Sequence, residues 1–170
     1  MKRFLVSAAW PLWMALLIAQ IVLSLFLYSP GGSPAFRILG WAVGLAAGLL
    51  GVWPIVSLRW KGGVQKQLDY THTTLLVDSG IYAVVRHPQY LSFMLISLFF
   101  ILVVQHWLVA VVGIAAIASV YLGIVPQAEK VDIAKFGDDY RRYMQRVPRL
   151  NLVAGVIRLL RRTEMEDERR

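Results

Sequence analysis

The sequence of 170 residues contains no cysteine. Without a thiol the chain can form no disulfide, no thiolate metal site and no thiol nucleophile. This absence excludes the membrane thiol oxidases and the cysteine-dependent quinone reductases, two enzyme classes that are also built as small helical bundles.

Charged residues are also scarce. They make up 16% of the chain, and hydrophobic residues make up 58%, whereas a soluble domain has about a quarter charged residues and about half apolar ones. This balance excludes a disordered protein and most water-soluble enzymes. The length predicts one domain over residues 1–170.

Four long runs contain no Asp, Glu, Lys, Arg or His, and they cover residues 4–33, 38–58, 88–105 and 107–127. A helix needs about 20 apolar residues to cross the hydrocarbon core of a bilayer. Proline and glycine shorten the first run, and the third is marginal in length. We therefore predict membrane spans at about 4–28, 38–58, 90–105 and 108–125. Buried helices of a soluble protein are the alternative, but four such runs would leave almost no amphipathic surface.

The distribution of lysine and arginine predicts the orientation of these spans. Of the 18 basic residues, Arg37 alone falls between the first and second spans, and all the others precede the first span, separate the second from the third, or follow the fourth. Basic residues favour the cytoplasmic side, so both termini are predicted to be cytoplasmic. This placement explains the net charge of +8 without nucleic acid and makes membrane lipids the expected partners. In a prokaryote the protein would lie in the plasma (inner) membrane.

No acidic or basic side chain lies inside a predicted span. Intramembrane charges mark ion pathways and proton-coupled transporters, so their absence argues against a transporter or channel. Any chemistry is therefore expected at the cytoplasmic face. In the second span Gly40, Gly44 and Gly48 recur at four-residue spacing, which predicts close packing of another helix rather than a ligand site.

The first polar segment, residues 60–90, precedes the third span. Asp78, Ser79 and Gly80 predict a turn, and Pro88 suits the first turn of a helix. Arg86 and His87 would then stand just before a helix N-terminus, where a guanidinium and backbone amides favour an anionic group such as a carboxylate. The alternative is that both side chains merely anchor to lipid phosphate.

The second polar segment, residues 126–150, follows the fourth span. Its apolar side chains recur every three or four residues and predict an amphipathic helix against the membrane or the bundle; they are Ile133, Phe136, Tyr140, Tyr143 and Val147. Gly137 weakens this helix near its middle. Residues 158–170 are rich in charge and are predicted to be a solvated tail.

These two segments resemble the integral-membrane methyltransferases, which include isoprenylcysteine carboxyl methyltransferase and phospholipid methyltransferase. The first motif is Gly80-x-Tyr82-x-x-x-Arg86-His87-Pro88-x-Tyr90, at the start of a hydrophobic hairpin. The second is Glu129, then Phe136-Gly137-x-x-Tyr140-x-x-Tyr143, then Val147-Pro148-Arg149. The resemblance covers about residues 60–150, and both motifs have the order and spacing of that family.

The resemblance implies S-adenosylmethionine (SAM) as methyl donor and S-adenosylhomocysteine as product, with a cofactor site on the cytoplasmic side. The positions that match the cofactor-binding residues of the family are Gln67, Thr74, Leu75, Leu76, Val77, Tyr82, His87, Pro88, Gln89, Tyr90 and Glu129. We expect Arg86 and Glu129 to be the catalytic residues. Arg86 or His87 would hold the methionine carboxylate, and Glu129 would hold the ribose hydroxyls or the amino group.

Two positions depart from the family pattern. Relatives commonly have two adjacent glutamates, but Ala128 occupies the first of these positions. Relatives that act on prenylcysteine carry an arginine at the position of Ile124. Without that cation a prenylcysteine carboxylate becomes a less favoured acceptor, and loss or redirection of activity becomes an alternative.

The predicted protein is therefore an all-α membrane protein with about four transmembrane helices and a cytoplasmic amphipathic helix after the last span. Its predicted function is SAM-dependent methylation of a lipid-like acceptor: a phospholipid amine, an isoprenylcysteine-type carboxylate or a thiol. Methyl transfer from a sulfonium depends on positioning and exclusion of water, so no metal is expected. The alternative is a non-catalytic membrane scaffold or binding protein that keeps the methyltransferase fold.

Overall fold

The computed structural model describes residues 8–64 and 72–167, and all regular structure in these ranges is helical. Three helices are long and apolar enough to cross a membrane: α1 (Ala9–Leu27), α2 (Pro34–Lys61) and the continuous helix Trp107–Phe136. A fourth apolar helix, α4 (Pro88–Val104), is shorter, with 17 residues. Its length agrees with the marginal third run in the sequence.

Further elements complete the described part of the chain. The continuous helix Trp107–Phe136 consists of α5 (Trp107–Ala118), a π-helical turn η1 (Ser119–Ile124) and α6 (Val125–Phe136). The short helix α3 (Ile81–Val84) precedes α4, and α7 (Asp138–Arg146) and α8 (Leu152–Asp167) follow α6. The chain divides into two compact units, one of residues 1–49 and 90–130 and the other of residues 50–89 and 131–170.

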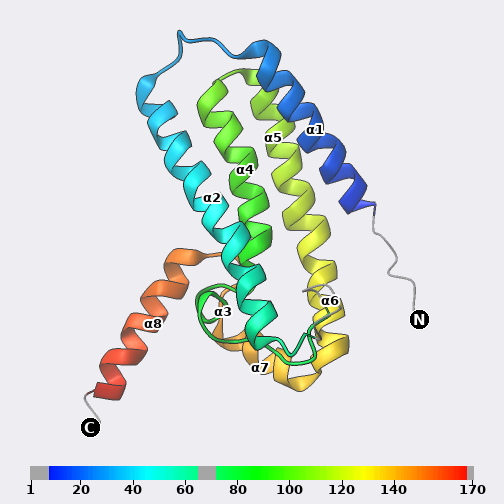
Figure 1. The fold of residues 1–170 in the computed structure, drawn as a ribbon, viewed down its shortest axis with the longest axis vertical. Helices are drawn as coiled ribbons and strands as arrows, with labels where there is room; N and C mark the ends of the chain where they lie inside the picture. Colours follow the sequence, from blue (N-terminus) through cyan, green and yellow to red (C-terminus); the bar gives the residue numbers. More distant parts are fainter. Residues whose placement is uncertain (1–7, 65–71, 168–170) are drawn as a thin grey trace. The chain divides into compact units, whose positions relative to one another are not determined.

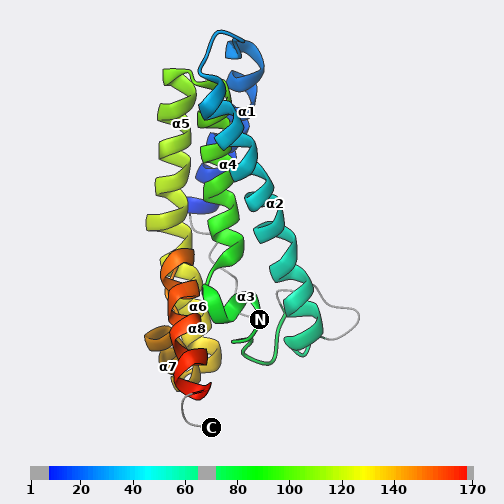
Figure 2. The same ribbon diagram turned by 90° about the vertical axis from the view of Figure 1, so that its left-hand side faces the viewer.

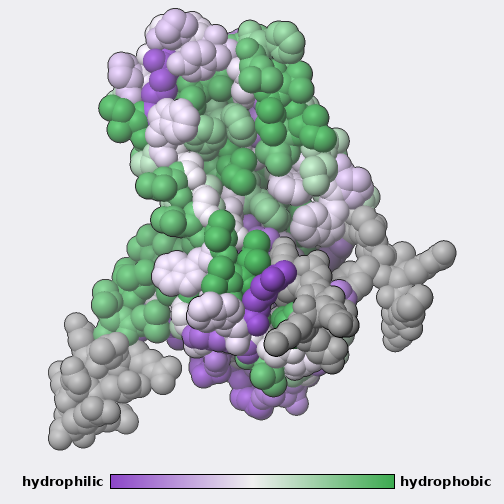
Figure 3. Space-filling view, viewed as in Figure 1, coloured by the Kyte–Doolittle hydropathy of each residue, from purple (hydrophilic) through white to green (hydrophobic). Residues whose placement is uncertain are grey.

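The first unit is a bundle of α1, the first part of α2, α4 and α5, whose outer surface is largely hydrophobic (Figures 1, 2 and 3). Many large apolar side chains on these helices are exposed, among them Phe26, Trp41 and Ile114. Water would penalise such exposure, whereas lipid tails do not. This surface therefore suits a multi-pass membrane protein.

Two of the three regularly spaced glycines on α2 pack closely against another helix, as the sequence predicts. A Cβ atom on Gly40 would stand 2.7 Å from Val103 Cγ2, and one on Gly44 would stand 2.8 Å from Phe99 Cδ2. Both distances are shorter than real Cβ contacts, so α2 approaches α4 closely because these residues lack a side chain. No atom lies within 4 Å of a Cβ placed on Gly48.

Two expectations for the segments after the fourth apolar run differ from the structure. The amphipathic helix predicted within residues 126–150 is divided at Gly137, whose φ of +59° ends α6 and precedes α7. Residues 158–167, predicted to be part of a charged tail, are helical and belong to α8. Asn151 Oδ1 accepts a hydrogen bond of 2.9 Å from the Ala154 amide and thereby caps the start of α8.

A leucine at Gly40 is expected to destabilise the protein, whereas a leucine at Gly48 is not. The Gly40→Leu side chain would overpack the α2–α4 contact at a cost of about 1–3 kcal/mol. Thermal unfolding in detergent micelles, followed by circular dichroism, should give a lower Tm for Gly40→Leu and an unchanged Tm for Gly48→Leu. Equal melting temperatures for the two variants would contradict the close approach of α2 and α4.

Candidate functional site

The loop before α3 is tied to the end of α2. The Thr74 and Leu75 amides donate hydrogen bonds of 2.8 and 3.1 Å to the Gly62 carbonyl, and the Thr74 hydroxyl donates one of 3.0 Å to the Gly63 carbonyl. Thr74 and Leu75 are exposed at this attachment, whereas Val77 is buried. The predicted stretch from Thr74 to Val77 thus leads the chain from the surface of the second unit into its interior.

Arg86 and His87 lie in the short link between α3 and α4. Gly80 has a φ of +63°, a conformation that favours glycine, and begins the turn into α3. Val85 is extended and fully buried, and Pro88 begins α4. The predicted places of the turn at Gly80 and of Pro88 in the first turn of a helix are confirmed. Arg86 and His87 consequently precede a helix N-terminus.

The two sequence motifs meet through their backbones in the second unit. The Arg86 amide donates a hydrogen bond of 3.0 Å to the Pro148 carbonyl, and the His87 amide donates one of 3.3 Å to the Arg149 carbonyl. These two bonds join the link before α4 to the chain that follows α7. Residues 62 positions apart in the sequence therefore lie side by side.

Side chains from α7 reinforce this junction. The Tyr143 hydroxyl donates a hydrogen bond of 2.6 Å to the Tyr82 carbonyl, and the Tyr140 hydroxyl lies 3.4 Å from His87 Nε2. Both tyrosines and His87 are buried, with 2 to 7% of each side chain exposed. Leu76 packs against the same cluster, which also includes Val147. The apolar stripe of the second motif thus faces the first motif.

The electrostatics of this cluster keep the Tyr143 phenol protonated. Burial raises the pKa of the Tyr143 hydroxyl well above its ordinary value, and the Arg86 guanidinium opposes this rise. A protonated phenol is a hydrogen-bond donor at any physiological pH. Tyr143 therefore acts as a fixed donor to the Tyr82 carbonyl, and Arg86 supplies positive charge beside it.

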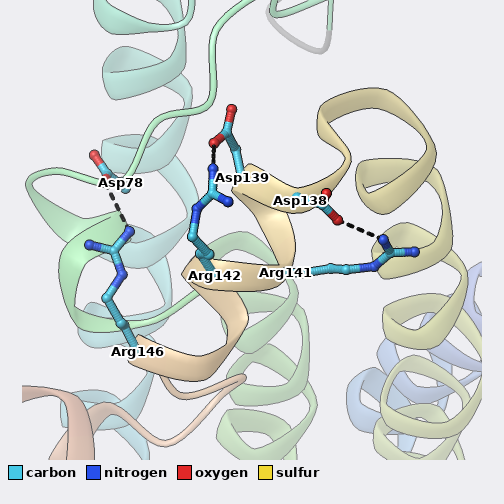
Figure 4. A network of polar contacts seen from close by, with 6 residues as sticks. All are labelled: Asp78, Asp138, Asp139, Arg141, Arg142 and Arg146. Carbon is cyan, nitrogen blue, oxygen red and sulfur yellow. Dashed lines mark hydrogen bonds and ion pairs between the residues drawn. The ribbon is translucent and has the colours of Figure 1, made fainter.

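Ion pairs lie on the solvent side of this junction (Figure 4). Arg146 on α7 lies 3.8 Å from Asp78 in the loop before α3. This ion pair is a further connection between the two polar segments. On α7 itself Arg141 pairs with Asp138 at 2.7 Å, and Arg142 pairs with Asp139. All six side chains are more than half exposed, so each pair contributes at most about 1 kcal/mol. The buried tyrosines and the backbone bonds matter more.

Two predicted site residues belong to the first unit. Tyr90 on α4 lies in an aromatic cluster, with ring centroids 6.1 Å from both Trp10 and Phe93. Glu129 on α6 is buried, with 4% of the residue exposed. A carboxylate is rarely buried in a protein interior, so the placement of Glu129 is consistent with its selection as a candidate site residue.

The structure brings together the predicted residues Leu76, Tyr82, Arg86 and His87 in the second unit. Pro88 and Gln89 continue from His87 into α4. Thr74 and Leu75 lie at the attachment to α2, and Gln67 lies outside the described residues.

Three contributors were not predicted as site residues. The sequence patterns place Tyr140 and Tyr143 in an apolar stripe and in the second family motif but not among the site residues, although a polar hydroxyl on a buried tyrosine usually requires a partner. Arg158 on α8 donates a hydrogen bond to the Ala83 carbonyl at the end of α3. No signal in the sequence marks this last contact, because it joins residues 75 positions apart.

Replacement of Gly137 by alanine should destabilise the turn between α6 and α7 through backbone conformation alone. No atom lies within 4 Å of the added Cβ, but φ is +59°, and a left-handed conformation costs an alanine about 1–2 kcal/mol. The Tm in detergent should fall. Gly48→Ala is the matched control, since its Cβ also meets nothing while its helical backbone favours alanine. A Tm for Gly137→Ala at or above that of the wild type would contradict the turn.

Comparison with known proteins identifies the family. The model of the isoprenylcysteine carboxyl methyltransferase family matches residues 42–134, which is more than half of the chain and includes both the Arg86–Tyr90 motif and Glu129. No curated protein and no solved structure matches. The chain therefore belongs to the isoprenylcysteine carboxyl methyltransferase family, a family of membrane methyltransferases.

Proposed function

We propose that this protein is a multi-pass membrane methyltransferase that uses SAM to methylate a lipid-like acceptor, with its active site on the cytoplasmic side. The observation that carries this proposal is the junction of the two motifs, in which the backbone of Arg86 and His87 pairs with Pro148 and Arg149. The enrichment of basic residues in the same segments supports the cytoplasmic orientation. The span count of four and the cytoplasmic termini are part of this proposal.

The residues at the junction suit the polar end of SAM. A methionine carboxylate requires cationic or N–H donors, and Arg86 and His87 supply a guanidinium and an imidazole beside the start of α4. The buried Glu129 is suited to ribose hydroxyls or to an ammonium group. Arg86 and His87 thus offer donors for the methionine carboxylate, and Glu129 offers an acceptor for the ribose hydroxyls or the amino group.

The cofactor, when bound, supplies a methyl group that a sulfonium has already activated. The work left to the chain is to position the acceptor and to exclude water. His87 is 7% exposed and Tyr140 is 3% exposed, so the surroundings of the Arg86–His87 link are largely dry. An amine acceptor must lose a proton before it reacts, and His87 and Glu129 are the buried groups available to take it.

The proposed acceptor partitions into the membrane. The helices of the first unit expose apolar side chains along their length, so a lipid-like acceptor can approach laterally while a soluble cofactor arrives from water. Ile124 is buried and apolar, so it supplies no cation to a carboxylate. This favours a phospholipid amine or a thiol over an isoprenylcysteine-type carboxylate.

The second candidate function is a non-catalytic membrane scaffold. Ala128 is the observation in its favour, because relatives commonly have a second glutamate there. Such a protein would keep the junction of the two motifs for stability alone. Binding of SAM separates the two candidates.

Calorimetric titration of SAM into the detergent-solubilised protein should give saturable heat. Loss of a charged hydrogen-bonding group costs about 1.5–3 kcal/mol, so His87→Gln and Glu129→Gln should each weaken SAM binding about ten- to a hundred-fold. His72→Gln is the matched control, because His72 is exposed in the loop before α3.

Two outcomes of this titration contradict the proposal. Absence of heat at millimolar SAM, in a protein whose circular dichroism is unchanged, would exclude the enzyme and leave the scaffold. Wild-type affinity in both His87→Gln and Glu129→Gln would mean that the cofactor site has been assigned to the wrong residues.

The class of acceptor should be visible in the chemistry of the product. Incubation with tritiated-methyl SAM and a membrane lipid extract should label a component that keeps its label after mild base, because N-methyl and S-methyl bonds resist hydrolysis. A carboxyl methyl ester would release volatile methanol instead. Release of most of the label would contradict the exclusion of carboxylates that rests on Ile124.

A further inference from the structure

The orientation of α8 about its own axis is fixed by packing on α3. A Cβ on Gly155 would collide with the Val84 carbonyl oxygen, so this position tolerates only glycine. One turn later Arg158 donates a hydrogen bond to the Ala83 carbonyl. Gly155 and Arg158 therefore define the inner face of α8, and the opposite face is turned away from α3.

The opposite face of α8 is an apolar stripe without a partner among the described residues. It consists of Val153, Val156, Ile157 and Leu160, which are between 41 and 67% exposed. Spacings of three and four place these side chains on one side of the helix over two turns. Figure 3 shows the corresponding hydrophobic surface on α8. The apolar side chains of α7 differ from this stripe, because Tyr140 and Tyr143 are buried in a hydrophobic cluster.

The sequence around this apolar stripe is basic. Residues 149–162 contain four arginines and no aspartate or glutamate. Arg158 lies on the inner face of α8, whereas Arg161 is exposed one residue after Leu160. An apolar stripe with cationic neighbours is the pattern of helices that lie in the plane of an anionic bilayer surface. Because the same chain contains membrane-spanning helices, α8 is tethered to a bilayer and meets it at high effective concentration.

A second copy of the chain is a poorer fit for this face. The stripe has four side chains over two turns, whereas a stable protein interface has about 20–30 residues on each side. An abundance of arginine around the stripe would also bring like charges together in a symmetric pair. Anionic lipid headgroups are complementary to the same charges.

We propose that α8 is an in-plane membrane helix that inserts Val153, Val156, Ile157 and Leu160 into an anionic lipid surface. Arg161 contacts the headgroups, while Gly155 and Arg158 hold the helix to α3. Through α3, which ends at Val84, two residues before Arg86, lipid contact is linked to the polar segment of the second unit. The inference does not depend on the identity of the methyl donor or acceptor.

The absence of cysteine permits a direct test in the full-length protein. Val156→Cys places a single thiol on the stripe, and Ala154→Cys places one at an exposed position on another side of α8. Each variant is labelled with an environment-sensitive NBD fluorophore and reconstituted into vesicles of phosphatidylcholine alone or of phosphatidylcholine with phosphatidylglycerol.

In the anionic vesicles we expect the label at Val156→Cys to shift to the blue and to be quenched several-fold more by nitroxide lipids than the label at Ala154→Cys. The effect should be weaker in phosphatidylcholine alone. Addition of Arg161→Gln to Val156→Cys should lower the ratio of inserted to free α8 about five-fold in anionic vesicles, because each basic residue near such a surface contributes on this scale.

Other results would overturn the proposal. Equal, water-like emission from both labels in anionic vesicles would show that α8 stays in solution. Shielding of the Val156→Cys label that depends on protein density and not on lipid charge would show that a second copy covers the stripe. In either case circular dichroism of the labelled variants must match the wild type, and the Ala154→Cys protein serves as the reference for the effect of labelling.

Discussion

The second unit depends on the backbone pairing of Arg86 and His87 with Pro148 and Arg149. These residues lie in links between helices, where the amides have no helical partner and must find one elsewhere. Once the two links pair, Tyr140 and Tyr143 can reach His87 and the Tyr82 carbonyl. A short stretch of irregular chain thereby gains a fixed geometry, which is what a site made of loop residues needs.

A related constraint governs the first unit, where polar groups must be satisfied without water. Gln20 in α1 is fully buried, and its Nε2 donates hydrogen bonds of 2.9 Å to the Ser97 carbonyl and 3.4 Å to the Val109 carbonyl. One side chain therefore connects α1 to α4 and α5. In a bilayer, where apolar contacts between helices bring little gain over lipid contacts, such bonds and close packing hold helices together. Gly113 leaves room for this amide, because a Cβ there would collide with Gln20 Nε2.

The sequence predicted the elements that follow from local chemistry. The four uncharged runs locate α1, α2, α4 and the helix from Trp107, because hydropathy is a property of each run by itself. Pro88 marks the start of α4 for the same reason. The contacts of Tyr140 and Arg158 could not be predicted, since periodicity shows which residues share a face and not what that face meets. The helix α8 was missed because its packing on α3 depends on Gly155 and Val84, which are distant in sequence.

The π-helical turn η1 explains how Glu129 comes to be buried in the continuous helix Trp107–Phe136. Before the turn the buried residues are Val109, Gly113, Ala116 and Val120, at the spacing of an unbroken α-helix. In such a helix Glu129 would stand about 200° around the axis from Val109, on the far side. A π turn inserts about one extra residue and turns everything after it back by about 100°. Glu129 therefore moves toward the buried face, and Gly123 permits the turn to pack closely against Ala9. The burial of this candidate site residue thus depends on a local irregularity in the helix, which hydropathy and periodicity do not reveal.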